Sequence, residues 1–190
     1  MRIVIAGILG GIVMFVWGAL AHTALPLGQQ GMHLGTPSKA TLSALAQDSA
    51  GAGAGIYMLP SPTNEVMGDE KAMEAFAAEH GKDAYAFVVY QPGGNPAMTD
   101  MGPNLIRQFG SDTLAALLAA FVMSLGALGF GKRVMIAGTM GLFSWLTTNV
   151  PYWNWYGFPL DFTVAGLIEL LVGWLLAGAA MAWWLGRKGR

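Results

Sequence analysis

The chain has 190 residues, of which 54% are hydrophobic and only 11% are charged. This composition and a positive mean hydropathy are typical of membrane proteins rather than soluble domains. Cysteine is absent, which excludes disulfides, thiolate metal sites and a cysteine nucleophile. The sequence contains no basic tract with interleaved aromatic residues, so nucleic acid is not an expected partner.

Four apolar stretches predict four transmembrane helices, because a hydrocarbon core about 30 Å thick needs roughly 20 apolar residues in a helix. They are 3–21, 113–130, 134–150 and 162–185, and they predict a membrane all-α four-helix bundle. The first also resembles a signal peptide, but its apolar run is longer than usual, so we expect an uncleaved anchor. The third is the most polar, and a short buried hairpin is the alternative interpretation there.

The basic residues predict the orientation, since Lys and Arg in short loops stay on the cytoplasmic side. With four spans, one side of the membrane carries cations and no acid: Arg2, Lys132, Arg133, Arg187, Lys188 and Arg190. Every acidic residue except Glu169 falls within 23–112 or 151–161, on the other side. We therefore expect a bacterial inner-membrane protein with both termini, including the basic tail 186–190, in the cytoplasm.

Residues 23–111 are too many for a simple connector and predict a small extracytoplasmic α/β insertion between the first two transmembrane helices. Helices are expected from Thr36-Pro37 to Asp48 and from Asp69 to Gly81, where capping residues and apolar spacing agree. Strands are expected at 56–59 and within DAYAFVVYQ, where apolar side chains alternate along the chain.

The start of the second transmembrane helix has two interpretations. Gly102-Pro103 has the pattern of an early helix start, which would place Arg107 near lipid phosphates. Alternatively, Gly110-Ser111-Asp112 breaks the chain, and Ser111 or Asp112 caps a new helix.

An aromatic-rich segment at 151–161 lies between the third and fourth spans and predicts a short outer loop at headgroup depth. There, Trp and Tyr rings form an interfacial belt. The alternative is a contact surface for a partner protein, a lipid head group or a quinone-like ring. The candidate contact residues are Tyr152, Trp153, Trp155, Tyr156 and Phe158.

Each predicted span carries a pair of small residues four positions apart, the pattern that lets membrane helices approach closely. In the second span the pair is Ala115 and Ala119. The other three spans supply Gly7 and Gly11, Ala137 and Gly141, and Gly173 and Ala177. Together these pairs favour a compact bundle, or one that also docks against foreign helices.

Glu169 is the one ionisable residue inside a predicted span, and an intramembrane carboxylate needs a partner, a proton or water. The expected partners are His22, the group Thr147, Thr148 and Asn149, and Trp indole groups. His22, Glu169 and Asn149 thus form a candidate polar site. Its role is a structural hydrogen bond, a contact with a subunit or lipid, or proton or ion handling.

Scattered His and Met residues raise the possibility of an outer copper site, because imidazole and thioether ligands suit Cu(I). The set is His22, His33, His80, Met32, Met98 and Met101, with only the last two closely spaced. This weak spacing favours ordinary packing and loop methionines. No nucleophile with a neighbouring base is visible, so an enzyme is not expected.

The segments GGIVMFVWGALAHTALPLG and YWNWYGFP, with the basic tail, resemble an uncharacterised family of bacterial four-span inner-membrane proteins. In layout alone the chain is similar to claudin-type proteins, without their Trp and Cys signature. The resemblance brings no activity with it, and it leaves any cofactor unknown. The expected function is a non-enzymatic accessory or scaffolding subunit of a larger complex, such as a respiratory or photosynthetic one. The alternative is a small transporter or a lipid- or quinone-binding membrane protein that uses Glu169 and the aromatic segment.

Overall fold

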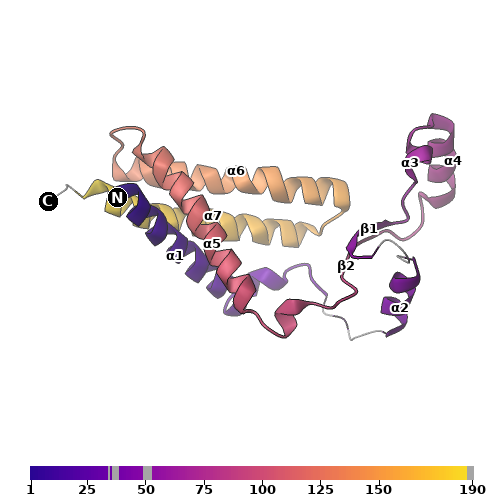
Figure 1. Cartoon of the computed structure of the whole chain (residues 1–190). Helices are drawn as coiled ribbons and strands as arrows, with labels where there is room; N and C mark the ends of the chain where they lie inside the picture. The colour runs from indigo at the N-terminus through magenta and orange to yellow at the C-terminus, as the bar shows by residue number, and fades with distance from the viewer. Residues whose placement is uncertain (34, 36–38, 49–52, 188–190) are drawn as a thin grey trace. The chain divides into compact units, whose positions relative to one another are not determined.

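The computed structural model describes residues 1–33, 35, 39–48 and 53–187. The chain divides into two compact units, one formed by Met1–Leu34 with Ala97–Arg190 and the other by Gly35–Pro96. Both units are built mainly from helices (Figure 1). The Thr36-Pro37 helix start, Gly51 and the last two basic residues of the tail lie outside the described residues.

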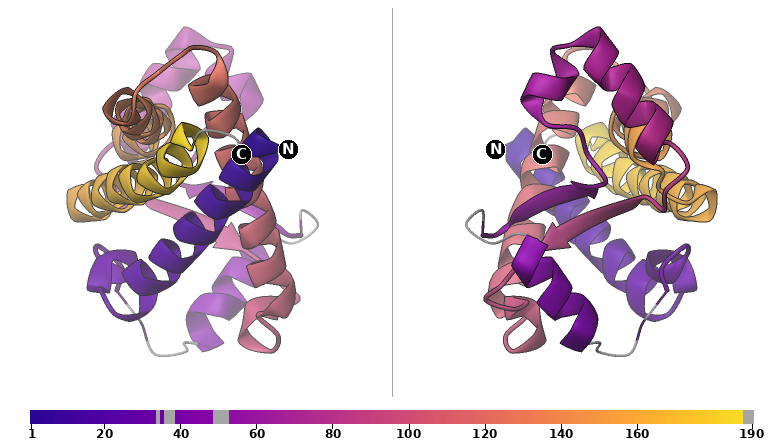
Figure 2. Two further views of the ribbon diagram at one scale, coloured as in Figure 1. Left: turned by 90° about the vertical axis from the view of Figure 1, so that its left-hand side faces the viewer. Right: turned by 90° about the vertical axis from the view of Figure 1, so that its right-hand side faces the viewer.

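The first unit is a helical bundle of α1 (Arg2–Thr23), α5 (Gly102–Ser124), α6 (Phe130–Tyr156) and α7 (Leu160–Gly186). The short 3-10 helix η1 (Pro26–Gln29) follows α1, and η2 (Pro96–Met98) precedes α5. Among the described residues, α1, α5 and α7 are long and apolar enough to cross a membrane. α6 pairs with α7, and α1 packs between α5 and α7 (Figure 2). The predicted helical fold is thus confirmed, and three of its helices have the length and composition of membrane spans.

The core of the bundle consists largely of small side chains. Buried alanines from α1, α5, α6 and α7 meet around Met123, Trp174 and Met181. A Cβ at Gly7 would lie 2.5 Å from Leu117, and a Cβ at Gly11 would lie 2.5 Å from the Thr113 hydroxyl. The same close approach occurs between α6 and α7, where Gly178 faces Ala137 and Gly141 faces Trp174. Close backbone contact through small residues is what holds helices together when lipid surrounds them.

The predicted outer loop at 151–161 is wrong over most of its length, because α6 continues to Tyr156 with Pro151 inside it. Only three residues then separate α6 from α7. Gly157 ends α6 in the left-handed conformation, with φ at 69°, and its N–H bonds to the Tyr152 carbonyl. Proline interrupts a helix in water, but membrane-type bundles tolerate it where neighbouring helices support the backbone. The third predicted span, 134–150, is therefore the middle of a longer helix.

α5 settles the open boundary in favour of the early start, since it runs unbroken from Gly102 through Asp112 to Ser124. The Asp100 carboxylate caps this start by accepting from the Gly102 N–H at 2.8 Å. The predicted bounds 113–130 are accordingly wrong at both ends, because residues 125–129 lie outside any helix. The insertion predicted to end at 111 ends before Gly102.

The second unit contains α2 (Lys39–Asp48), β1 (Gly55–Leu59), α3 (Asn64–Met67), α4 (Glu70–His80) and β2 (Ala86–Tyr90). β1 and β2 form an antiparallel pair with Ile56 opposite Val89, which confirms the two predicted strands. Asp69 caps α4 as predicted, accepting from the Ala72 N–H at 3.0 Å.

The sequence did not indicate α3, a single turn capped by Thr63. A side-chain hydrogen bond with Thr63 lowers the pKa of the Glu65 carboxyl below its ordinary value. This interaction favours the ionised form of Glu65 in the first turn of α3, where a negative charge suits the helix dipole.

Candidate functional site

Glu169 on α7 is paired with His22, one of its expected partners, which lies in the last turn of α1. His22 Nε2 lies 3.0 Å from Glu169 Oε1. The His22 side chain is 55% exposed and the Glu169 side chain is 28% exposed, so water reaches the histidine more than the carboxylate. The pair joins the end of α1 to the middle of α7.

A second contact fixes α1 against the same residue. The Trp17 indole N–H donates to the backbone carbonyl of Glu169 at 2.9 Å, rather than to its carboxylate. Gly173 leaves room for the indole, since a Cβ at this position would lie 2.7 Å from Trp17 Cδ1. A helix carbonyl has two lone pairs, so the contact adds to the ordinary helical hydrogen bond.

The His22 ring is also covered by the chain that follows α1. Gly28 in η1 packs on it so closely that a Cβ would collide with the imidazole. Pro26 starts η1 and fixes the turn that brings Gly28 back over the ring. His22 is therefore positioned by both η1 and Glu169.

α5 contributes a polar pair that the sequence did not single out. The Gln108 amide donates to Asp112 Oδ1 at 2.9 Å, across one helical turn. The sequence signal for this pair is the spacing of four residues between Gln108 and Asp112. That spacing brings the two side chains together only if α5 begins at Gly102 and so includes both residues. Asp112 was expected to be a helix cap or part of an outer acidic surface.

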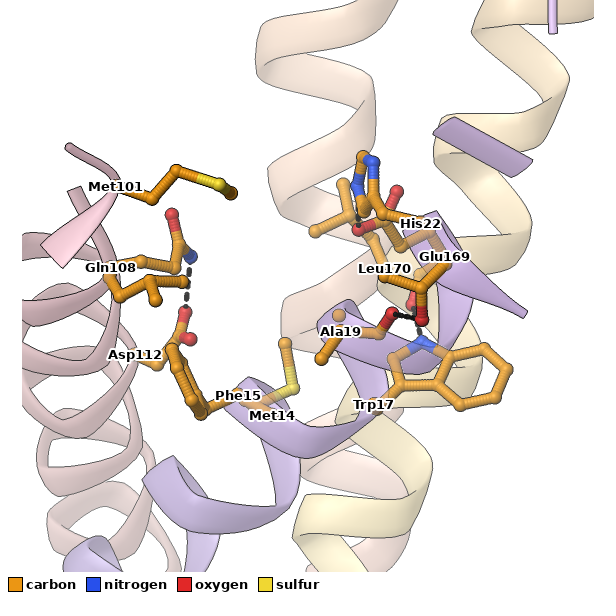
Figure 3. Close-up of a pocket in the computed structure, with 13 residues that line it drawn as sticks. Met14, Phe15, Trp17, Ala19, His22, Met101, Gln108, Asp112, Glu169 and Leu170 are labelled. Atoms are coloured by element: carbon orange, nitrogen blue, oxygen red, sulfur yellow. Dashed lines mark hydrogen bonds and ion pairs between the residues drawn. The ribbon is translucent and has the colours of Figure 1, made fainter. Parts of the chain in front are cut away.

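These two polar pairs lie on opposite sides of one cavity of about 410 Å³ between α1, α5 and α7 (Figure 3). Figure 3 shows Gln108 and Asp112 on one side and His22, Glu169 and Trp17 on the other, with Met14 and Phe15 between them. All the lining residues belong to the first unit.

The cavity combines an apolar wall with a few polar groups, as small-molecule sites do. Its larger apolar side chains are Met14, Phe15, Trp17, Met101, Leu105 and Leu170. Its polar side chains are His22, Thr23, Gln108, Asp112 and Glu169, and none of the described lining residues is Lys or Arg. The cavity therefore presents two carboxyl groups and no strong cation.

Within the described ranges, no group of three or more His, Cys, Asp or Glu side chains is arranged to hold a metal ion. Of the methionines considered for copper, Met101 lines the cavity together with His22, while Met98 lies exposed. The two methionines expected as a pair thus do not share this site.

Asn149, the third residue of the predicted polar site, lies on α6 and contacts α7 one turn before Glu169. It packs against Gly166 of α7, where a Cβ would lie 2.5 Å from its amide nitrogen, and it does not line the described cavity. Thr147 bonds back to carbonyls of its own helix. The predicted site is therefore a pair, His22 and Glu169, extended by Gln108 and Asp112.

The aromatic residues of the segment 151–161 gather at the junction of α6 and α7, and none of them lines the described cavity. Tyr152 packs on Tyr156 and Phe158, with ring centroids 5.5 and 5.2 Å apart. Phe158 in turn packs on Phe162 at 5.4 Å. Trp155 is 77% exposed and Trp153 is also exposed, so this aromatic end presents rings on the protein surface.

No protein-family model, curated protein or solved structure matches this chain.

Proposed function

We propose that this chain is a non-enzymatic, four-span membrane protein that binds a small amphipathic molecule in the cavity between α1, α5 and α7. The observation that carries the proposal is the opposition of the His22–Glu169 pair and the Gln108–Asp112 pair across about 410 Å³ of largely apolar space. Pockets of about 300 to 1,000 Å³ with such linings are typical ligand sites.

The fourth span in this proposal is α6. It has 27 residues, like α7, and a helix of that length is about 40 Å long, enough for a hydrocarbon core of about 30 Å. α6 packs along α7 and contributes Ala137 and Gly141 to the bundle core. Its Thr and Asn residues near the aromatic end explain its lower hydropathy.

The orientation proposed is cytoplasmic for the end where the basic residues meet, in a bacterial inner membrane, with 35–96 on the opposite side. Arg2 donates to the carbonyls of Leu185 and Arg187. Arg133 donates to the Met123 carbonyl at 3.4 Å. These contacts gather cations from three helix ends, the charge pattern that is retained in the cytoplasm.

The open space beside the two polar pairs favours ligand binding over a purely structural role. A structural hydrogen bond between helices is most effective when side chains pack tightly around it. Here the two pairs border open space. A carboxyl group within a membrane helix is energetically costly, and such residues usually face a partner or a water-filled cavity and mark functional sites.

The test is to fill the cavity without touching its polar groups. Gly18 lines the cavity, and a Cβ added there would meet nothing within 4 Å, so Gly18→Leu adds volume without an initial clash. Gly110→Leu is the matched control, because Gly110 is also helical, has equally open surroundings and lies outside the cavity lining. Small molecules retained through gentle purification are expected with the wild type and the control but not with Gly18→Leu. Their absence from all three proteins would refute the proposal.

A second candidate function is an accessory or scaffolding subunit that contacts other membrane subunits and lipids. The exposed rings of Trp153 and Trp155 favour it. However, Gly7, Gly11, Ala137, Gly141, Gly173 and Ala177 are all occupied by contacts or burial within the chain. A partner would therefore dock on the aromatic end, and Trp153→Ala with Trp155→Ala is expected to abolish co-purification of that partner.

A further inference from the structure

We propose that the cavity binds an organic cation, an ammonium group carried on an apolar body, held between Asp112 and Glu169. This inference rests on the proposed ligand-binding function and specifies the ligand's chemistry. The two carboxyl groups come from different helices, α5 and α7, and lie on opposite sides of the space. A positive charge placed between them would be attracted by both.

The charge of the cavity wall selects the ligand. Asp112 and Glu169 are its acidic groups, and His22 is the only described lining residue that can carry a positive charge. A neutral or anionic ligand would displace water from these carboxyl groups without replacing its hydrogen bonds, which is unfavourable. A cation replaces them with charge-assisted hydrogen bonds or ion pairs.

Each carboxyl group retains capacity for such a bond. In the described structure, Glu169 uses Oε1 toward His22, and Asp112 uses Oδ1 toward Gln108. A carboxylate has two oxygens with about four acceptor positions, so these contacts orient each group without saturating it. His22 and Gln108 therefore act as positioning residues for the two acceptors.

The apolar part of the wall suits the rest of the cation. Phe15 and Trp17 line the cavity, and the Trp17 N–H is already directed to the Glu169 carbonyl. Aromatic rings attract cations through their π-systems, and Phe15 and Trp17 are the aromatic residues of the lining. Met14 and Leu105 provide further apolar contact.

A quinone-like ring fits this chemistry less well. Quinone carbonyls accept hydrogen bonds and donate none, so they cannot bond to the two carboxylates of the lining, whereas an ammonium group can. A phosphate or other anion would face two carboxyl groups with no Lys or Arg among the described lining residues. The size of the cavity suits one small molecule or a single lipid head group rather than a whole phospholipid.

The experiment measures charge selectivity on the full chain in a maltoside detergent, which contains no ammonium group. The probes are benzylammonium, its uncharged isostere ethylbenzene, and the anion benzylsulfonate, compared by NMR titration. The wild type is expected to bind the cation at least about tenfold more tightly than either other probe, since hydrogen bonds to charged groups contribute about 1.5 to 3 kcal/mol.

Two variants test whether the cation binds between the two carboxyl groups. Asp112→Asn and Glu169→Gln are each expected to weaken cation binding about tenfold and to leave ethylbenzene binding unchanged. Glu74→Gln, an exposed carboxyl in the second unit, is the control and is expected to bind like the wild type. If Glu169→Gln fails to fold, the wild-type selectivity and Asp112→Asn still decide the result.

The source of the ammonium group is decided by competition. Displacement of the probe by phosphatidylethanolamine but not by phosphatidylglycerol would identify a lipid head group, whereas displacement by neither would identify a free amine. Equal binding of the cation and its isostere would overturn the cation inference and leave the ligand-binding function standing. Absence of all probe binding, with no co-purified small molecule, would overturn both.

Discussion

Trp17 on α1 donates its indole N–H to the backbone carbonyl of Glu169 on α7, at 2.9 Å. The contact fixes the axial position of α1 against the residue whose carboxylate meets His22, a little more than one turn further along α1. Glu169 therefore contributes to the register between α1 and α7 through its backbone and to the cavity wall through its side chain.

Trp17→Phe is expected to lower the free energy of unfolding by about 1 kcal/mol, because it removes one hydrogen bond between helices and keeps most of the ring packing. Thermal unfolding in detergent measures the change. Trp155→Phe is the matched control, since Trp155 is largely exposed, and it should be close to neutral. Equal stability of Trp17→Phe and the wild type would show that the indole contact contributes nothing to the register.

The His22–Glu169 pair is expected to be energetically coupled. A double-mutant cycle with His22→Phe and Glu169→Leu should give a coupling energy of about 1 kcal/mol, the scale measured for polar contacts between membrane helices. Unfolding of the four proteins in mixed micelles supplies the cycle. Strict additivity would mean that the two side chains act independently despite their 3.0 Å contact.

Gly7, like Gly11 one turn further along α1, is expected not to tolerate a side chain. A Cβ there would lie 2.5 Å from Leu117 Cδ2 and 2.8 Å from the Leu117 Cα, and a backbone atom cannot rotate away. Gly7→Leu should therefore separate α1 from α5 and destabilise the bundle by about 1 to 3 kcal/mol or more. Gly131→Leu, with open space around it, is the control, and thermal stability of both variants is the measurement.

Gly157 is expected to be required by its backbone conformation. Its φ of 69° ends α6 and turns the chain into α7, and a side chain there costs about 1 to 2 kcal/mol. Gly157→Ala should lower the midpoint of thermal unfolding, whereas Gly129→Ala, at a φ of −72°, should not. If the two variants unfold at similar midpoint temperatures, glycine is not required at this helix end.

Local patterns predicted the elements whose signals lie within a few residues of each other. Asp69 and Gly81 bracket α4, and alternating apolar residues mark β2. The apolar runs likewise predicted α1 and α7 to within a few residues. In each case, capping or periodicity alone fixes the local backbone, so the sequence was sufficient.

The errors came from residues whose effect depends on neighbouring helices. Pro151 predicts a helix end in an isolated segment, yet α6 passes through it beside α7. Gly110 and Ser111 left the start of α5 open between two interpretations, and only an unbroken α5 puts Gln108 and Asp112 on the cavity wall. His22 was an expected partner of Glu169, but the cavity between the two polar pairs arises from how three helices pack, which the sequence does not display.

The proposed crossing of α6 can be tested directly because the chain has no cysteine to remove. Single variants Lys132→Cys, near the start of α6, and Trp155→Cys, near its end, place one thiol at each end of the helix. With a membrane-impermeant maleimide on intact bacterial spheroplasts, Trp155→Cys should react at once and Lys132→Cys only after permeabilisation. Glu74→Cys should react like Trp155→Cys, since the basic residues are expected to retain the other end in the cytoplasm. Reaction of both α6 thiols from the same side would mean that α6 does not cross, and reversed labelling of all three would invert the orientation.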